Sequence, residues 1–249
     1  MSAKNFRAVQ AGERTNGDGK QIRNKVLLAM PDNEYKLMRP DLKYIDLPHH
    51  LSLHEPTQNI TFVYFPNRGM VSQVVVTKDG RTVEVGVVGK EGYVGAGLAA
   101  GLSRSSVREV VQIAGDGFRI VGNALERILR SAPQLQVILN RHTGLQGMQV
   151  AQTAACNRLH DIQQRLSRWL LMTQDRVDAG VLPITHDFIA TMMGTDRSTV
   201  SLAAAVLQKK RIIEYMRGTV KIVNRRKLEI SACECYDVIQ QFEDDIGLR

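Results

Sequence analysis

The chain has 249 residues, of which 43% are hydrophobic, so it can bury one large core or two modest ones. Its formal net charge is +8, which favours an anionic partner without separating nucleic acid from a membrane surface. Cys156, Cys233 and Cys235 are too few for a disulfide framework, and no apolar run reaches the ~18–20 residues of a membrane span. We therefore expect a cytoplasmic protein with no membrane partner.

The first 20 residues mix Gly, Lys, Asp, Asn and Arg without periodicity, which predicts a flexible arm over residues 1–20. Between Gln21 and Met38 the pattern predicts two short helices, the second of which can start at Pro31.

From Leu42 to Val121 the sequence is rich in β-branched and aromatic residues. The turn signals are Lys78-Asp79-Gly80 and Gly115-Asp116-Gly117. The expected strands cover residues 60–65, 70–76, 82–88, 107–114 and 118–121. Short strands without long helices between them predict an antiparallel β-roll, in a domain over residues 21–131.

Apolar residues then recur at steps of three and four, which predicts one long helix over residues 132–178, although Gly144 and Gly147 weaken its middle. Its apolar stripe is longer than one small domain can cover, so we expect a second copy of the chain to cover the rest. The expected dimerisation residues are Leu145, Met148, Ala151, Ala155 and Leu159.

The segment 183–210 contains two short helical patterns separated by Gly194. Thr185 is a plausible N-cap of the first helix, and Thr195 or Asp196 of the second. This is the layout of a helix-turn-helix, in which the start of the second helix reaches base edges. The residues placed there are Arg197, Ser198, Thr199 and Ser201.

The segment RIIEYMRGTVKIVN predicts two short strands about Arg217-Gly218, which form a β-wing, and residues 226–242 predict a last helix. Residues 195–227 hold nine Lys and Arg against two acidic residues, so the positive charge concentrates beside the helix-turn-helix. We expect a DNA-binding domain over residues 179–249, with Arg217 and Lys221 contacting phosphates.

Three segments resemble the Crp/Fnr family of bacterial transcription regulators: ITHDFIATMMGTDRSTVSLAAAVLQKKRII (184–213), NRLHDIQQRLSRWLLMTQDRV (157–177) and VEVGVVGKEGYVG (83–95). The resemblance implies an α+β fold with a cyclic-nucleotide-binding-like β-roll, a long dimerisation helix and a winged helix-turn-helix. It also implies a homodimer that binds a pseudo-palindromic operator in double-stranded DNA, works with RNA polymerase and can respond to a small-molecule effector.

The resemblance places Arg197 at the position that contacts a guanine, and Thr185 and His186 at positions that contact phosphates. Ser198 replaces the family's frequent Glu, and Leu202 stands where several members have a second Arg. The half-site is therefore expected to differ from the family's best-known consensus.

The family's cyclic-nucleotide pocket uses a Gly-Glu pair and an Arg-Ser pair. Here the matching residues are Gly95-Ala96 and, with a gap, Arg104-Ser105. Loss of the Glu removes a charge-assisted bond worth ~1.5–3 kcal/mol, so we do not predict cyclic AMP binding. The N-terminus also lacks the cysteines of an iron–sulfur sensor.

Other patterns have weaker functional interpretations. GAGLAA (95–100) fits a dinucleotide-binding fingerprint, the basis of an alternative cofactor-binding or enzymatic function. Cys156 and His160 could share a metal, but no third ligand lies near them in the sequence. His49, His50 and His54 lie between expected strands, where histidines are more often solvated than metal-bound, and Cys233-Glu234-Cys235 lacks a second cysteine pair. No nucleophile motif is present. We expect no catalytic residues, no cofactor and no metal.

Overall fold

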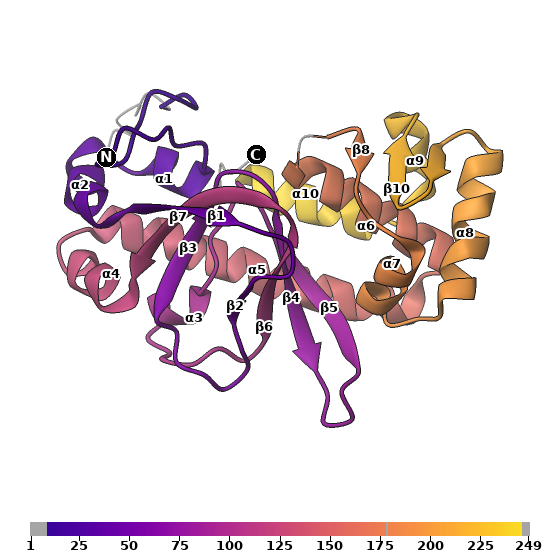
Figure 1. Ribbon diagram of the computed structural model, residues 1–249, viewed down its shortest axis with the longest axis horizontal. Helices are drawn as coiled ribbons and strands as arrows, with labels where there is room; N and C mark the ends of the chain where they lie inside the picture. The colour runs from indigo at the N-terminus through magenta and orange to yellow at the C-terminus, as the bar shows by residue number, and fades with distance from the viewer. Residues whose placement is uncertain (1–8, 178, 246–249) are drawn as a thin grey trace.

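Helix α5 (Pro133–Leu159) runs along the molecule behind a β-roll and reaches the helical domain at the other end (Figure 1). A computed structural model of the chain describes residues 9–177 and 179–245. The strands of the β-roll pair antiparallel, and helices with a small sheet follow it. The α+β class predicted from the sequence is therefore confirmed.

Residues 9–20 pack against the fold. Arg14 is 6% exposed and donates hydrogen bonds to the carbonyls of Leu27 and Met30, while the buried Asn16 donates to the carbonyl of Leu42. The prediction of a flexible arm is therefore wrong for residues 9–20, because these hydrogen bonds offset the conformational entropy that is lost when the segment becomes ordered. The expectation for residues 1–8 lies outside the described residues.

The two predicted N-terminal helices are present. They are α1 (Lys25–Ala29) and α2 (Asp32–Met38), with Pro31 at the N-cap of α2, and the 3₁₀ turn η1 (Arg39–Asp41) follows them.

Two antiparallel sheets form the β-roll. One has the order β1-β7-β3 and the other β2-β6-β4-β5. The strands are β1 (Lys43–Leu47), β2 (Ser52–His54), β3 (Phe62–Pro66), β4 (Met70–Val76), β5 (Thr82–Val88), β6 (Arg108–Ile113) and β7 (Gly115–Val121). Two of them, β1 and β2, were not predicted.

The predicted turn at Gly115-Asp116-Gly117 is wrong, because these residues begin strand β7. A Cβ on Gly115 would lie 2.1 Å from the carbonyl oxygen of Arg68, and one on Gly117 would lie 2.5 Å from that of Phe65. The glycines therefore allow close approach of two backbone segments, a use that sequence does not distinguish from a turn.

Two short helices, α3 (Ala96–Ala99) and α4 (Gly122–Leu129), precede α5.

The prediction of a single helix over residues 132–178 is wrong. Helix α5 ends at Leu159, His160 is extended, and α6 (Ile162–Val177) begins after it. Asp161 Oδ1 accepts from the backbone N–H of Gln164, and Gln164 Oε1 accepts from that of Asp161. This reciprocal capping pair starts a new helix where apolar periodicity alone indicates continuation.

The C-terminal domain contains helices and a sheet of order β8-β10-β9. Its elements are β8 (Val181–Leu182), α7 (His186–Met193), α8 (Arg197–Lys209), β9 (Ile213–Met216), β10 (Thr219–Ile222), α9 (Arg225–Ser231) and α10 (Cys235–Asp245). The last helix expected over 226–242 is therefore two helices, because α9 ends at Ser231 and Ala232 is extended. No helix in the described part of the chain is long and apolar enough to cross a membrane.

Helix α6 packs with the C-terminal domain. Its Leu170 and Leu171 share one apolar core with residues of α7 and α8 and with Val87 of β5. The boundary expected at residue 179 therefore falls after a helix that contributes to the core of the C-terminal domain. That core also reaches the β-roll, so the two parts contact each other directly.

Candidate nucleic-acid interface

Helices α7 and α8 form the predicted helix-turn-helix. The Thr185 hydroxyl accepts from the backbone N–H of Phe188 at 3.2 Å, and Gly194 ends α7 with a φ of 61°, which glycine adopts without strain. Asp196 occupies the N-cap position of α8, although its side chain makes no capping hydrogen bond. The buried faces of both helices join one core. The outer face of α8 is left at the surface.

The start of α8 presents Arg197 and Ser198 to solvent, while Thr199 is half-buried. The Arg197 side chain is 67% exposed, and its Nε lies 3.5 Å from Oδ1 of Asp187. An exposed pair of this kind contributes at most about 1 kcal/mol, so the guanidinium is free to exchange this partner for a base edge. Leu202, one turn further along, is 70% exposed and offers an apolar contact.

His186 and Ser201 were predicted to contact DNA, but their side chains interact with each other and His186 also stacks on the wing. His186 Nδ1 lies 3.0 Å from the Ser201 hydroxyl, and its ring stacks on Tyr215 of β9 with centroids 3.8 Å apart. Burial, followed by the charge of Arg197, lowers the pKa of His186. The neutral imidazole therefore ties α7, α8 and the wing together.

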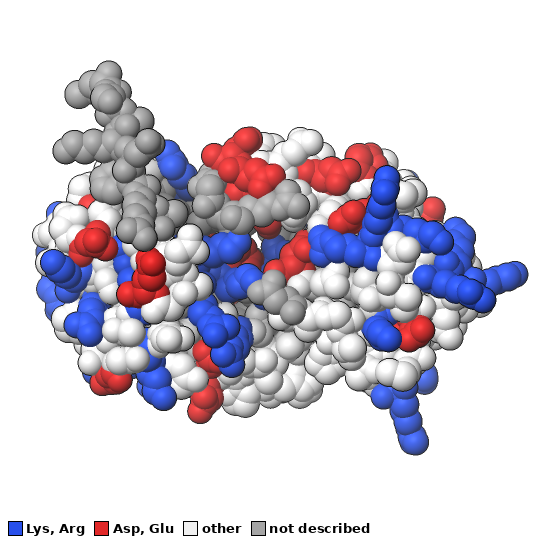
Figure 2. Space-filling model, turned by 90° about the horizontal axis from the view of Figure 1, so that it is seen from above, with Lys and Arg blue, Asp and Glu red and all other residues white. Residues whose placement is uncertain are grey.

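The predicted wing is formed by β9 and β10, and Arg217 is exposed at its tip beside Gly218. Lys221 is 48% exposed, with Nζ 3.5 Å from Glu214 Oε2. Figure 2 shows Lys and Arg gathered over the end of the molecule that carries α8 and α9. Arg225 differs from its neighbours, because it is held by Asp175 and Tyr236.

The candidate effector residues surround the short helix α3. Gly95 precedes it with a φ of 92°, and Ala96 and Ser105 are buried, while Arg104 is exposed. The Ser105 hydroxyl donates to the carbonyl of Val107 at 2.7 Å, so its hydrogen is already used. Of these four residues, Arg104 alone has a side chain that is both charged and exposed to a possible effector.

A buried polar cluster lies behind this loop. His54 Nδ1 lies 2.5 Å from Glu109 Oε2, and Gln73 donates to the other oxygen of that carboxylate at 2.9 Å. A Cβ on Gly95 would lie 3.1 Å from His54 Cε1. Protein side chains therefore occupy the space behind the loop.

The dinucleotide fingerprint at 95–100 lacks its structural context. The strands on either side of it, β5 and β6, both pair antiparallel with β4. A dinucleotide loop requires a parallel β-α-β unit with a helix opening on the glycines. This topology contradicts the alternative function based on the Gly95 loop.

Helix α5 presents an exposed apolar stripe. Met148 and Leu159 are 45% and 74% exposed, Ala151 is exposed and Ala155 is half-buried. Their spacing of three and four residues places them on one face. Leu145 was expected in this stripe, but it is buried within the chain at 6% exposure. The dimerisation set is corrected accordingly, because residue 145 lies toward the face that packs on the protein's own core.

Buried polar contacts that the sequence did not indicate connect the β-roll to the C-terminal domain. Trp169 of α6 donates to Glu84 of β5 at 2.7 Å. Arg176 Nε lies 3.0 Å from Glu91 Oε1, and its Nη2 lies 3.2 Å from Glu243 Oε1. Burial disfavours ionisation of Glu91, but Arg176 and backbone N–H groups outweigh it and hold its pKa below the usual range. A glutamate in the apolar stretch TVEVGVV was the available sequence signal for Glu84.

Comparison with known proteins agrees with this geometry. Residues 164–230 match the Crp-like helix-turn-helix domain. The chain has a Crp-like helix-turn-helix domain. No curated protein sequence matches the chain.

Solved structures of Crp/Fnr-type proteins share its fold. A putative Crp/Fnr-family regulator from Eubacterium rectale has 15% identity and a TM-score of 0.63, with 81% of this chain and 94% of that chain covered. The regulator CLP from Xanthomonas campestris has 16% identity and a TM-score of 0.64, with 77% and 99% covered. FixK2 from Bradyrhizobium japonicum has 15% identity and a TM-score of 0.63, with 77% and 98% covered. The Crp-like domain therefore lies within a Crp/Fnr-type fold.

Proposed function

We propose that this protein is a transcription regulator that binds a pseudo-palindromic operator in double-stranded DNA as a homodimer. The observation that carries the proposal is the exposed Arg197 on the first turn of α8, beside a wing and within a Crp-like domain. The planar guanidinium can bond O6 and N7 of one guanine together. Ser198 and Thr199 on the same turn are the next candidates for base contact.

Phosphate contacts would set the register of α8 in the major groove. Thr185 is exposed at the start of α7, and Arg217 and Lys221 lie on the wing. These positions flank the recognition helix, so they can reach the DNA backbone on either side of it. His186 and Ser201 support this surface by fixing the wing against α7 and α8.

The apolar stripe of α5 supports a two-fold dimer. Exposed Met148, Ala151 and Leu159 would pack against the same residues of a second copy. A Cβ at Gly144 or Gly147 would meet nothing within 4 Å in the single chain, so a partner helix has space to approach there. The two recognition helices would then read half-sites about 34 Å apart.

Control by an effector in the β-roll is part of the proposal. Strand β5 packs on α7, and a Cβ on Gly194 would lie 3.2 Å from Val83. A ligand that bound one arrangement of the β-roll better would shift the position of the helix-turn-helix. Bound at a promoter, the dimer would recruit or block RNA polymerase.

The proposal is tested with the full chain and a library of random-sequence duplexes. Light scattering of the complex with an enriched duplex should give two chains per duplex, and affinity should fall steeply as salt rises. Equal affinity for enriched and unselected duplexes, or one chain per duplex, would contradict it.

A further inference from the structure

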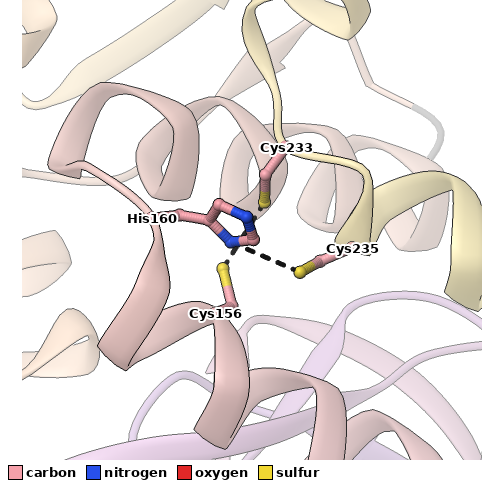
Figure 3. Close-up of side chains that lie close together, drawn as sticks. All are labelled: Cys156, His160, Cys233 and Cys235. Carbon is pink, nitrogen blue, oxygen red and sulfur yellow. Dashed lines mark hydrogen bonds between the residues drawn. The ribbon is translucent and has the colours of Figure 1, made fainter.

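All three cysteines of the chain and His160 meet at the end of α5. Cys156 and His160 come from its last turn and C-cap, Cys233 lies between α9 and α10, and Cys235 is the first residue of α10. Their four ligand atoms all lie within 4.8 Å of one another, and Figure 3 shows the side chains pointing toward one another. We propose that these four residues bind one Zn²⁺ ion.

The spacing of the four side chains fits a single ion. The Sγ atoms of Cys156 and Cys233 lie 3.5 Å apart, and Cys235 Sγ lies 3.5 Å from His160 Nδ1. Zn–S bonds of about 2.3 Å in a tetrahedron separate two ligands by about 3.8 Å. Small side-chain shifts therefore complete the geometry. A disulfide between Cys156 and Cys233 would leave Cys235 and His160 without a role.

The donor set selects zinc among common cations. Three thiolates and one imidazole form a closed four-ligand site of the structural type, with no open position for a substrate. Thiolate ligands disfavour Mg²⁺ and Ca²⁺, which take oxygen ligands. An iron–sulfur cluster would require the ligands to spread around several metal atoms, whereas these ligand atoms converge within 4.8 Å.

Neighbouring side chains orient the four ligands and offset the negative charge of the zinc–thiolate group. His160 Nε2 lies 3.2 Å from Glu234 Oε1, so the carboxylate can hold the ring with Nδ1 toward the sulfurs. Gln152 Nε2 donates to Cys235 Sγ at 3.1 Å. Zinc with three thiolates carries one negative charge, and Arg165 and Arg168 line the same cavity as Cys156. The Nε atoms of both arginines are buried without a hydrogen-bond partner in the described part of the chain.

The site joins the end of α5 to the connection between α9 and α10. His160 occupies the break between α5 and α6, and Cys233 lies 77 residues from Cys156 in sequence. Bound Zn²⁺ would fasten the α9–α10 connection to the end of α5, at the junction between the exposed stripe of α5 and the DNA-binding domain. Metal binding of this kind couples directly to the stability of the elements it joins.

Metal content of the full chain tests the proposal without any DNA. Protein purified under reducing conditions without chelator should contain one zinc per chain by mass spectrometry. Replacement with Co²⁺ should give the visible absorption of a tetrahedral site and a sulfur-to-metal charge-transfer band. Cys235→Ser should lose most of the zinc and the Co²⁺ spectrum.

A milder pair of variants keeps the test informative if Cys235→Ser fails to fold. Glu234→Gln should weaken Zn²⁺ binding by about 10–100-fold in competition with a chromophoric chelator. Asp237→Asn removes another exposed carboxylate near the start of α10 and should leave the affinity unchanged.

Two results would overturn the zinc assignment: a reduced chain with no stoichiometric zinc and no Co²⁺ spectrum, and iron with inorganic sulfide in place of zinc. Equal affinities for Glu234→Gln and Asp237→Asn would contradict the role of Glu234 in orienting His160. Zinc should also slow hydrogen exchange at residues 232–236, and unchanged exchange would contradict its fastening role.

Discussion

The indole N–H of Trp169 donates a 2.7 Å hydrogen bond to Oε1 of Glu84, which joins α6 of the C-terminal domain to β5 of the β-roll. Ser72 donates to the other carboxylate oxygen at 2.5 Å. Burial raises the pKa of Glu84 to about 7, against the lowering effects of Ser72, Trp169 and the charges of Arg176 and Arg168. Trp169 is the single tryptophan of the chain, so its fluorescence reports on this contact.

Glu84 should make the stability of the protein depend on pH. Its pKa is about 7 in the folded chain, against 4.5 for an unperturbed glutamate, so the folded chain keeps a proton that the unfolded chain loses. The contribution of Glu84 is fully present below pH 4.5 and is lost as pH rises toward 7. Glu84→Gln mimics the neutral carboxyl and should remove about 1–3 kcal/mol of this dependence. Urea titrations followed by Trp169 fluorescence between pH 5 and 8 measure it, and parallel profiles for both proteins would contradict it.

Arg197→Ala should weaken binding to the preferred operator by ~1–3 kcal/mol and relax the preference at one base position. The reason is loss of the two bonds that a guanidinium makes to guanine. Arg197→Lys is the matched control for charge, because it should keep nonspecific affinity while losing most of the discrimination. Gel-shift titrations over operators with single-base changes measure both effects. An unchanged order of preference in Arg197→Ala would show that another residue reads the base.

Lys221→Ala should weaken binding to all duplexes alike and reduce the slope of log affinity against log salt by about 1. Lys221 lies on the wing, where a phosphate can replace its exposed pairing with Glu214. Lys43→Ala removes an exposed cation from β1 of the β-roll and should leave the slope unchanged. Equal slopes for Lys221→Ala and the unaltered protein would remove the wing from the interface.

Met148→Glu should convert the protein to a monomer, because it places a charge within the apolar stripe of α5. Val150→Glu, at a 38% exposed position on another face of the same helix, should remain a dimer. Analytical ultracentrifugation of both variants measures the mass. The assignment of the stripe fails if both variants have the same mass as the unaltered protein.

The helix-turn-helix and wing could be predicted because their signals are local. Thr185 caps α7 through a neighbouring N–H, Gly194 adopts the left-handed turn, and the apolar spacing marks both buried faces. Strands β4 and β5 also have the predicted bounds, because their alternating residues and the Lys78-Asp79-Gly80 turn act within one hairpin.

The remaining features depend on contacts between distant residues. Residues 9–20 are held against the fold because the side chains of Arg14 and Asn16 donate hydrogen bonds to carbonyls of later elements. The break at His160 was locally encoded in the Asp161–Gln164 capping pair, but the continuing apolar pattern masked it. The proposed zinc ligands lie in two stretches, and each had too few donors to indicate a site until the fold brought them together.

Two copies of the chain are proposed to read two half-sites through α8. Sequencing of the duplexes that the full chain enriches from a random library tests this dimeric recognition. We expect two inverted half-sites with centres about one helical turn apart. Enrichment of a single half-site, or no enrichment above the starting library, would contradict it.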